Sequence, residues 1–137
     1  MSSECSLCGA ELAPPSASWE FFLPLEPPSQ NQVASNTGGG RWRYKRLRDE
    51  YTLLLRAEKN RQGIPDATAK RRVTITRLYA GRGKERDLGN VIGGAKVLLD
   101  CMTATRLIVD DAPRWLECHY RQERASAAGV VVRVEDV

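Results

Sequence analysis

Two stretches of the chain, at about 72–79 and 115–122, alternate apolar and polar residues as half-buried β-strands do. Two further strands are predicted at about 19–23, which is rich in aromatic residues and stopped by Pro24, and at about 129–135, which is rich in valine. The stretches at 115–122 and 129–135 are separated only by residues 123–128. This short link predicts a β-hairpin that pairs them.

Two other stretches repeat apolar residues every three or four positions, which is the period of an amphipathic helix. The first covers about 43–61 and has a stripe of Leu47, Tyr51, Leu54 and Leu55. The second covers about 90–103 and has a stripe of Val91, Ala95, Leu98 and Met102, with Asp87 or Asn90 as the expected N-cap. Gly93 and Gly94 each cost roughly 1 kcal/mol against alanine. They indicate that a packed strand or a phosphate approaches the helix backbone closely.

The predicted order of elements is β-α-β-α-β-β, and 137 residues suffice for one hydrophobic core. We expect an α+β fold with a single compact domain at 18–137, in which one mixed sheet carries two helices. Residues 1–17 are expected to form a flexible N-terminal tail. The chain contains no long apolar run and no basic-then-apolar leader, so we expect a cytoplasmic protein that does not contact membranes.

The tail contains Cys5-Ser-Leu-Cys8-Gly, which is half of a zinc-knuckle pattern. A structural Zn²⁺ site normally has four ligands. The other candidates, Cys118 and His119, are neighbours in a predicted strand and therefore point to opposite faces. Zinc bound at Cys5 and Cys8 and a tail without metal both remain open.

The net charge of +4 is distributed unevenly along the chain. Residues 1–40 carry four acids and no base, residues 41–86 carry fifteen Lys and Arg against five acids, and residues 87–137 carry six against eight. A basic segment of this kind either binds a polyanion such as DNA or forms a solvated surface. The candidate DNA-binding residues are Arg41, Arg43, Lys45, Arg46, Arg48, Arg82, Lys84 and Arg86, with Trp42 and Tyr44 interleaved for stacking on bases.

Carboxylates follow the basic segment at both ends of the second predicted helix. Asp87 and Asn90 stand at its start, and Asp110 and Asp111 come shortly after its end. Oxygen ligands of this kind suit Mg²⁺. Lys96 lies between them, either as an ion-pair partner of Asp100 four residues on or as a group that stabilises charge on a reacting phosphate.

Taken in order, these motifs resemble the RusA family of Holliday-junction resolvases. The family pattern is a first strand, a Pro-Pro-Ser-Asn-like loop, a basic helix, D-x-D-N, a helical K-x-x-x-D and a terminal D-D before a strand. The matching segments cover roughly residues 19–137: Leu23-Pro-Leu-Glu-Pro-Pro-Ser-Gln-Asn31, the 41–48 cluster, Asp87-Leu-Gly-Asn90, Lys96-Val-Leu-Leu-Asp100 and Asp110-Asp111. Gly89 replaces the second aspartate of D-x-D-N, and the segment from Asn90 to Lys96 is longer, as in a phage-type branch of the family.

The resemblance implies a Mg²⁺-dependent endodeoxyribonuclease, with Mn²⁺ as an alternative ion, that cuts four-way DNA junctions in recombination and repair. It implies a homodimer without an organic cofactor. Asp87, Lys96 and Asp111 would be catalytic, and Asp87, Asn90, Asp110 and Asp111 would hold the metal. Two other functions stay open: a catalytically weak protein that binds branched DNA, which Gly89 favours, and a small zinc-containing regulator.

Overall fold

The computed structural model describes residues 17–29 and 38–137, with side chains from residue 42 onward in the second range. Its elements are β1 (Ser18–Leu23), α2 (Gly38–Gln62), β2 (Arg71–Tyr79), α3 (Leu88–Ala104), β3 (Leu116–Arg124) and β4 (Gly129–Asp136). The predicted α+β class and element order are confirmed. Cys5 and Cys8 lie outside the described residues, so zinc binding there stays a prediction.

The four strands form one mixed sheet in the order β1-β4-β2-β3. β4 runs antiparallel to both β1 and β2, whereas β2 and β3 are parallel. The predicted hairpin between the last two strands is therefore wrong, because β2 lies between them. The link at residues 125–128 crosses the end of β2, where the Ala125 N–H donates to the Tyr79 carbonyl at 2.9 Å. The four residues of this link are long enough to cross the roughly 10 Å from β3 over β2 to β4, so its short length does not require a hairpin.

The composition of the last two strands explains which of them is central. Val130, Val132 and Val134 of β4 are fully buried. In β3, by contrast, charged side chains alternate with the partly buried Cys118 and Tyr120. Placing the valine-rich β4 between two strands removes more apolar surface from water than placing the charged β3 there would. β3 therefore lies at the edge of the sheet.

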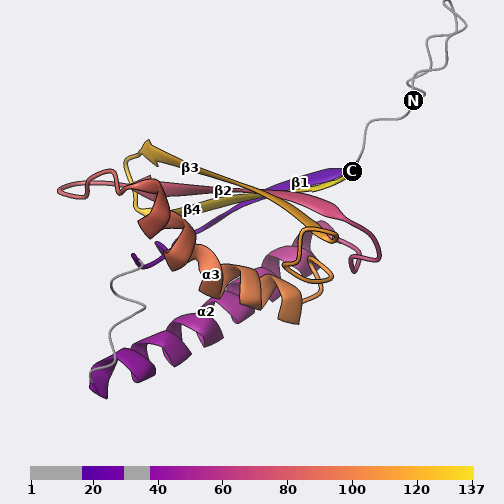
Figure 1. Cartoon of the computed structure of the whole chain (residues 1–137), viewed down its shortest axis with the longest axis horizontal. Helices are drawn as coiled ribbons and strands as arrows, with labels where there is room; N and C mark the ends of the chain where they lie inside the picture. The colour runs from indigo at the N-terminus through magenta and orange to yellow at the C-terminus, as the bar shows by residue number, and fades with distance from the viewer. Residues whose placement is uncertain (1–16, 30–37) are drawn as a thin grey trace, which may run out of the picture.

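Both helices pack on the same face of the sheet, which gives a two-layer molecule (Figure 1). The predicted apolar stripe of α3 is buried along its whole length. On α2, Tyr51 and Leu55 are buried, while Leu47 and Leu54 are partly buried against the core. The N-terminal half of α2 projects beyond α3 in Figure 1. Neither described helix combines the length and the apolar character needed to cross a membrane.

The close approach predicted at the glycines of α3 is made by the chain itself. A Cβ built on Gly94 would lie 1.6 Å from the carbonyl oxygen of Pro28. The segment after β1 therefore rests directly on the backbone of α3, and neither a strand nor a phosphate is required to explain this glycine. This contact places the proline-rich segment beside the first turns of α3.

Candidate functional site

Asp87 caps the N-terminus of α3. Its Oδ1 accepts from the Asn90 backbone N–H at 2.9 Å, and its Oδ2 accepts from Asn90 Nδ2 at 3.2 Å. Of the two predicted caps, the structure therefore selects Asp87. Because the amide NH₂ of Asn90 faces Asp87, its amide oxygen is turned away. Both oxygens of the Asp87 carboxylate are thus held in place by Asn90 at the helix terminus.

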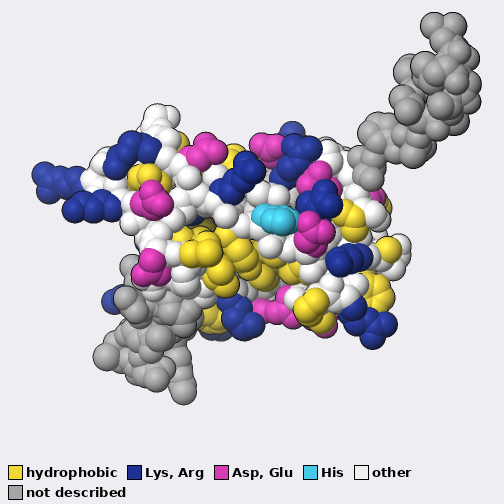
Figure 2. All heavy atoms as spheres, turned by 45° about the horizontal axis from the view of Figure 1, so that its top comes forward, with side chains coloured by type: hydrophobic (Ala, Val, Ile, Leu, Met, Phe, Trp, Pro, Cys, Tyr) yellow, Lys and Arg dark blue, Asp and Glu magenta, His cyan; other side chains and the backbone are white. Residues whose placement is uncertain are grey.

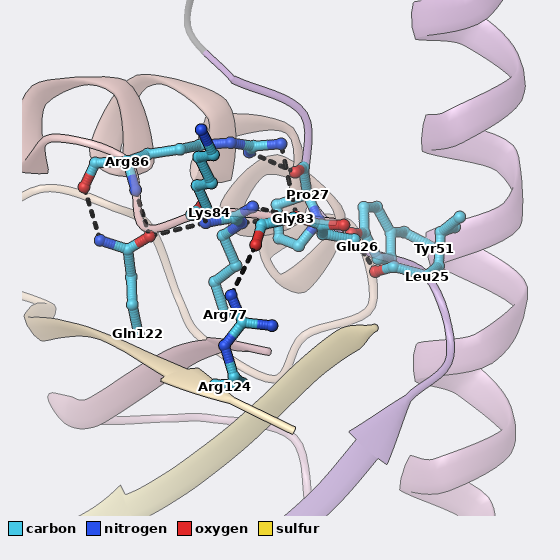
Figure 3. Close-up of polar contacts among 10 residues, drawn as sticks. All are labelled: Leu25, Glu26, Pro27, Tyr51, Arg77, Gly83, Lys84, Arg86, Gln122 and Arg124. Atoms are coloured by element: carbon cyan, nitrogen blue, oxygen red, sulfur yellow. Dashed lines mark hydrogen bonds and ion pairs between the residues drawn. The ribbon is translucent and has the colours of Figure 1, made fainter. Parts of the chain in front are cut away.

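A partly buried network of hydrogen bonds and ion pairs holds the loop that carries Asp87 (Figure 3). Arg86 donates to the Pro27 carbonyl at 2.8 Å and lies 3.4 Å from the Glu26 carboxylate. Gln122 of β3 clamps the backbone of Arg86, since its Oε1 accepts from the Arg86 N–H at 2.9 Å and its Nε2 donates to the Arg86 carbonyl at 2.6 Å. The residue before Asp87 is thus held by its side chain and its backbone together.

Glu26 joins this network to the core. Its carboxylate also pairs with Arg77 of β2, whose side chain is only 4 % exposed. Arg77 donates in addition to the Lys84 carbonyl at 2.9 Å and to Gln122 at 2.7 Å. One glutamate between two guanidinium groups therefore connects the proline-rich segment, β2 and the loop before α3.

Of the three cations in the 80–87 loop, Arg86 faces the protein interior and Arg82 and Lys84 face solvent. Arg86 is directed into the protein, and burial together with repulsion from Arg77 lowers its pKa. Arg82 and Lys84 have exposed side chains. Arg124 fixes the loop backbone by donating to the carbonyls of Gly81 and Gly83 at 3.0 and 2.9 Å. The predicted DNA contacts of this loop are consequently available at Arg82 and Lys84, whereas Arg86 has a structural role.

The predicted basic residues of α2 lie mostly on its projecting half. Arg43, Arg46 and Arg48 are exposed, and Lys45 pairs with Asp49 at 3.1 Å. Trp42 is 69 % exposed. The side chain of Arg41 lies outside the described residues. This half of α2 and the 80–87 loop lie at the same end of the long axis (Figure 1), and Figure 2 shows Lys and Arg side chains gathered where the loop projects.

The face of the sheet away from the helices carries mixed charges, in contrast to the basic half of α2 and the 80–87 loop. Acids and bases alternate there and neutralise one another through the pairs Glu20–Arg133 at 3.4 Å, Arg133–Glu135 at 3.5 Å, Arg72–Glu117 at 2.9 Å and Glu117–His119 at 2.7 Å. Cys118, next to His119, packs instead against the core. The opposite orientations predicted for these two residues are confirmed. Since acids pair with Arg72 and Arg133 on this face, its positive charge is partly neutralised, which makes it a less favourable surface for a polyanion than the basic end of the molecule.

Lys96 contacts the second acidic group rather than Asp100. Its Nζ lies 3.7 Å from Asp111 Oδ2. Asp100 accepts instead from the Tyr44 hydroxyl at 3.3 Å. Asp110 Oδ1 accepts from the Asp111 backbone N–H at 2.8 Å, which leaves its second oxygen for other contacts. The structure therefore brings Lys96 and Asp111 together and does not form the expected ion pair along the helix.

Tyr120 lies beside the loop that carries Asp87. It lines a pocket of about 290 Å³, together with Glu85, Arg86, Asp87, Leu88, Val91, Arg121 and Gln122. Burial, a hydrogen bond with Cys118 and the nearby charge of Asp111 raise the pKa of the Tyr120 phenol. Tyr120 therefore shares a pocket with Asp87, and the charge of Asp111 makes the smallest contribution to its raised pKa. Sequence reasoning did not include Tyr120 among the candidate site residues.

The donors at this site suit a hard cation. Within residues 17–29 and 38–137, no three carboxylate, histidine or cysteine side chains form a metal-binding group. Mg²⁺, however, is commonly held by one or two carboxylates, with waters and substrate phosphate oxygens completing its shell. Asp87, Asn90 and Asp111 offer oxygen ligands of the required type. The types of ligand that these residues offer therefore suit Mg²⁺.

Comparison with models of known protein families and with curated proteins finds no match for this chain.

Proposed function

We propose that this protein is a Mg²⁺-dependent, structure-selective DNA endonuclease that cuts four-way junctions. One observation carries the proposal: α3 carries the Asp87–Asn90 pair at its start and, in its middle, Lys96, which pairs with Asp111. The basic end of the molecule, with Arg82 and Lys84, supplies contacts for a polyanion. The motif order that resembles the RusA family adds independent support.

Each residue of the site has a task in this chemistry. Asp87, Asn90 and Asp111, with the second oxygen of Asp110, hold Mg²⁺, which when bound supplies positive charge at the phosphate. Lys96 is exposed, and its ion pair with Asp111 is long. Its ammonium can therefore turn from Asp111 to the phosphate and stabilise the negative charge that builds on it during hydrolysis. The cations of α2 and the 80–87 loop bind backbone phosphates and set the orientation of the DNA.

The proposed assembly is a homodimer. A four-way junction is cut symmetrically on two strands, which requires two sites related by a two-fold axis. Sedimentation at micromolar concentration should give a dimer. A fully active monomer would contradict this part of the proposal.

The decisive experiment is cleavage of a synthetic four-way junction in Mg²⁺ and in EDTA, with an unbranched duplex of the same sequence as the control. We expect paired cuts in Mg²⁺ only, and none in the duplex. Asp111→Asn should abolish cutting while junction binding stays equal or becomes tighter, because it removes a metal ligand and also a charge that repels phosphate. Equal loss of binding and cutting would make Asp111 a structural residue.

A second candidate, a junction-binding protein with weak cleavage, is favoured by Gly89. A Cβ at this position would lie 3.6 Å from Asp87 Oδ1, so an aspartate here would place a second carboxylate beside the first. Glycine leaves one carboxylate in that position, which weakens the attraction for a divalent cation. Junction binding without cuts at any Mg²⁺ or Mn²⁺ concentration would favour this candidate.

A further inference from the structure

We propose that the pocket beside Asp87 receives one unstacked DNA base next to the phosphate that is cut, and that Tyr120 is the ring on which this base stacks. The inference rests on the proposed cleavage of junctions. It adds a feature that the acidic site alone does not have, namely a way to distinguish a branch point from continuous duplex.

The size and walls of the pocket suit a single flat ring system. Its volume of about 290 Å³ is at the lower limit for ligand sites, with room for one base rather than for a dinucleotide-sized ligand. Tyr120 supplies an aromatic surface, and Val91 and Leu88 supply aliphatic ones. Leu88 is 60 % exposed although it is apolar. A base in the pocket would cover this side chain and remove apolar surface from water.

The polar groups of the pocket come from loop residues Glu85, Arg86 and Asp87 on one side and from the edge of the sheet on the other. β3 is the outermost strand, so alternate backbone N–H and C=O groups point away from β2. Tyr120, Arg121 and Gln122 of this strand line the pocket in succession. Base edges carry donors and acceptors that can pair with such backbone groups. Because the Gln122 side chain is already occupied by Arg86 and Arg77, the strand backbone remains the principal polar wall there.

The energetics favour branched DNA. Extruding a base from duplex requires unpairing and unstacking, and this cost is smallest where a base already lacks a partner. Bases at an open branch point are paired but lack a stacking neighbour on one side, so the unstacking part of this cost is smaller there than within duplex. Since Asp87 borders the same pocket, a base held there would place its own phosphate beside the carboxylate.

The test uses the full chain in EDTA, which prevents cutting, with four-way junctions that carry one 2-aminopurine at successive positions around the branch point. We expect the fluorescence to change on binding at one position and not at the others. Tyr120→Ala should alter that signal and weaken junction binding by about five-fold or more, the effect of losing one stacking ring. Binding to unbranched duplex should change by less than about two-fold. Tyr120→Phe, which keeps the ring, should behave as the wild type.

A second pair of variants leaves the core intact. Leu88→Trp fills the pocket from an exposed position and should reproduce the loss of junction binding. Leu53→Trp, at a leucine of α2 that is 67 % exposed and does not line the pocket, is its control and should bind normally. Normal junction binding and cutting by both Tyr120→Ala and Leu88→Trp would overturn this inference alone. A wild-type protein that does not prefer junctions to duplex would overturn the proposed function as well.

Discussion

Lys96 and Asp111 form an ion pair across 15 positions of the chain, with Nζ 3.7 Å from Oδ2, although Asp100 lies only one helical turn from Lys96. The carboxylate of Asp100 is occupied by the Tyr44 hydroxyl. Both members of the Lys96–Asp111 pair are substantially exposed, at 67 % and 40 %. A long, solvated pair of this kind holds its lysine loosely, which suits a group that must turn toward a substrate.

Lys96→Ala is expected to separate catalysis from stability. An exposed ion pair contributes roughly 0–1 kcal/mol, so the melting temperature should change little. Loss of a cation that stabilises charge on the reacting phosphate should slow single-turnover cleavage about 10²- to 10³-fold. Melting temperature, junction binding and cleavage are measured on one preparation.

Arg61→Ala is the matched control for Lys96→Ala, since it removes a basic residue from another exposed pair, Arg61–Glu58 on α2. It should leave both stability and cleavage near the wild-type values. If cleavage by Lys96→Ala falls by less than about ten-fold, or roughly 1.4 kcal/mol, Lys96 has only a surface role.

The cations on the projecting half of α2 should determine the salt dependence of binding. Each phosphate that the protein neutralises adds close to one unit to the slope of log K against log salt. Replacing Arg43 and Arg46 with alanine should therefore flatten the slope for junction DNA by roughly one to two units. The control replaces Arg56 and Arg61, which removes the same charge from the other half of the helix. Equal slopes for the two double variants would place the DNA surface elsewhere.

Gly89→Asp should increase Mg²⁺ affinity. The new carboxylate has room, because among residues 17–29 and 38–137 a Cβ at this position would meet Asp87 Oδ1 at 3.6 Å and no other group outside its own helix. An added charge near a divalent ion contributes about 1–2 kcal/mol in a solvated site, so half-maximal cleavage should require roughly ten-fold less Mg²⁺. Gly89→Asn has nearly the same shape without the charge and should show a smaller shift. Identical Mg²⁺ dependence of the two variants would mean that no ion binds beside Asp87.

Two alanine substitutions on α3 should change stability in opposite directions. At Gly94 a Cβ would overlap the Pro28 carbonyl, so the proline-rich segment must move, and we expect a loss of about 1–3 kcal/mol. At Gly89 a Cβ meets no backbone, and the higher helix propensity of alanine should add up to about 1 kcal/mol. Urea unfolding of both variants measures the difference. A stabilised Gly94→Ala protein would show that this contact is not tightly packed.

Local features of this protein were predictable because they depend on near neighbours in the chain. The stripes of the two helices and the faces of the third predicted strand follow from periodicity, since a side chain's direction is set by its own backbone. Asp87 was recognisable as a helix cap because its partner is only three residues away. The α+β class followed from the order of these elements.

The sequence by itself therefore determined the elements, their buried faces and the presence of acids next to a basic segment. Only the tertiary structure decided which strand lies between which partners, whether Arg86 faces solvent or Glu26, and that Lys96 pairs with Asp111. These are pairings between residues far apart in the chain, and several partners satisfy the same local pattern. The choice among them depends on the burial of apolar surface and the satisfaction of buried charges over the whole molecule, which no local stretch of sequence specifies.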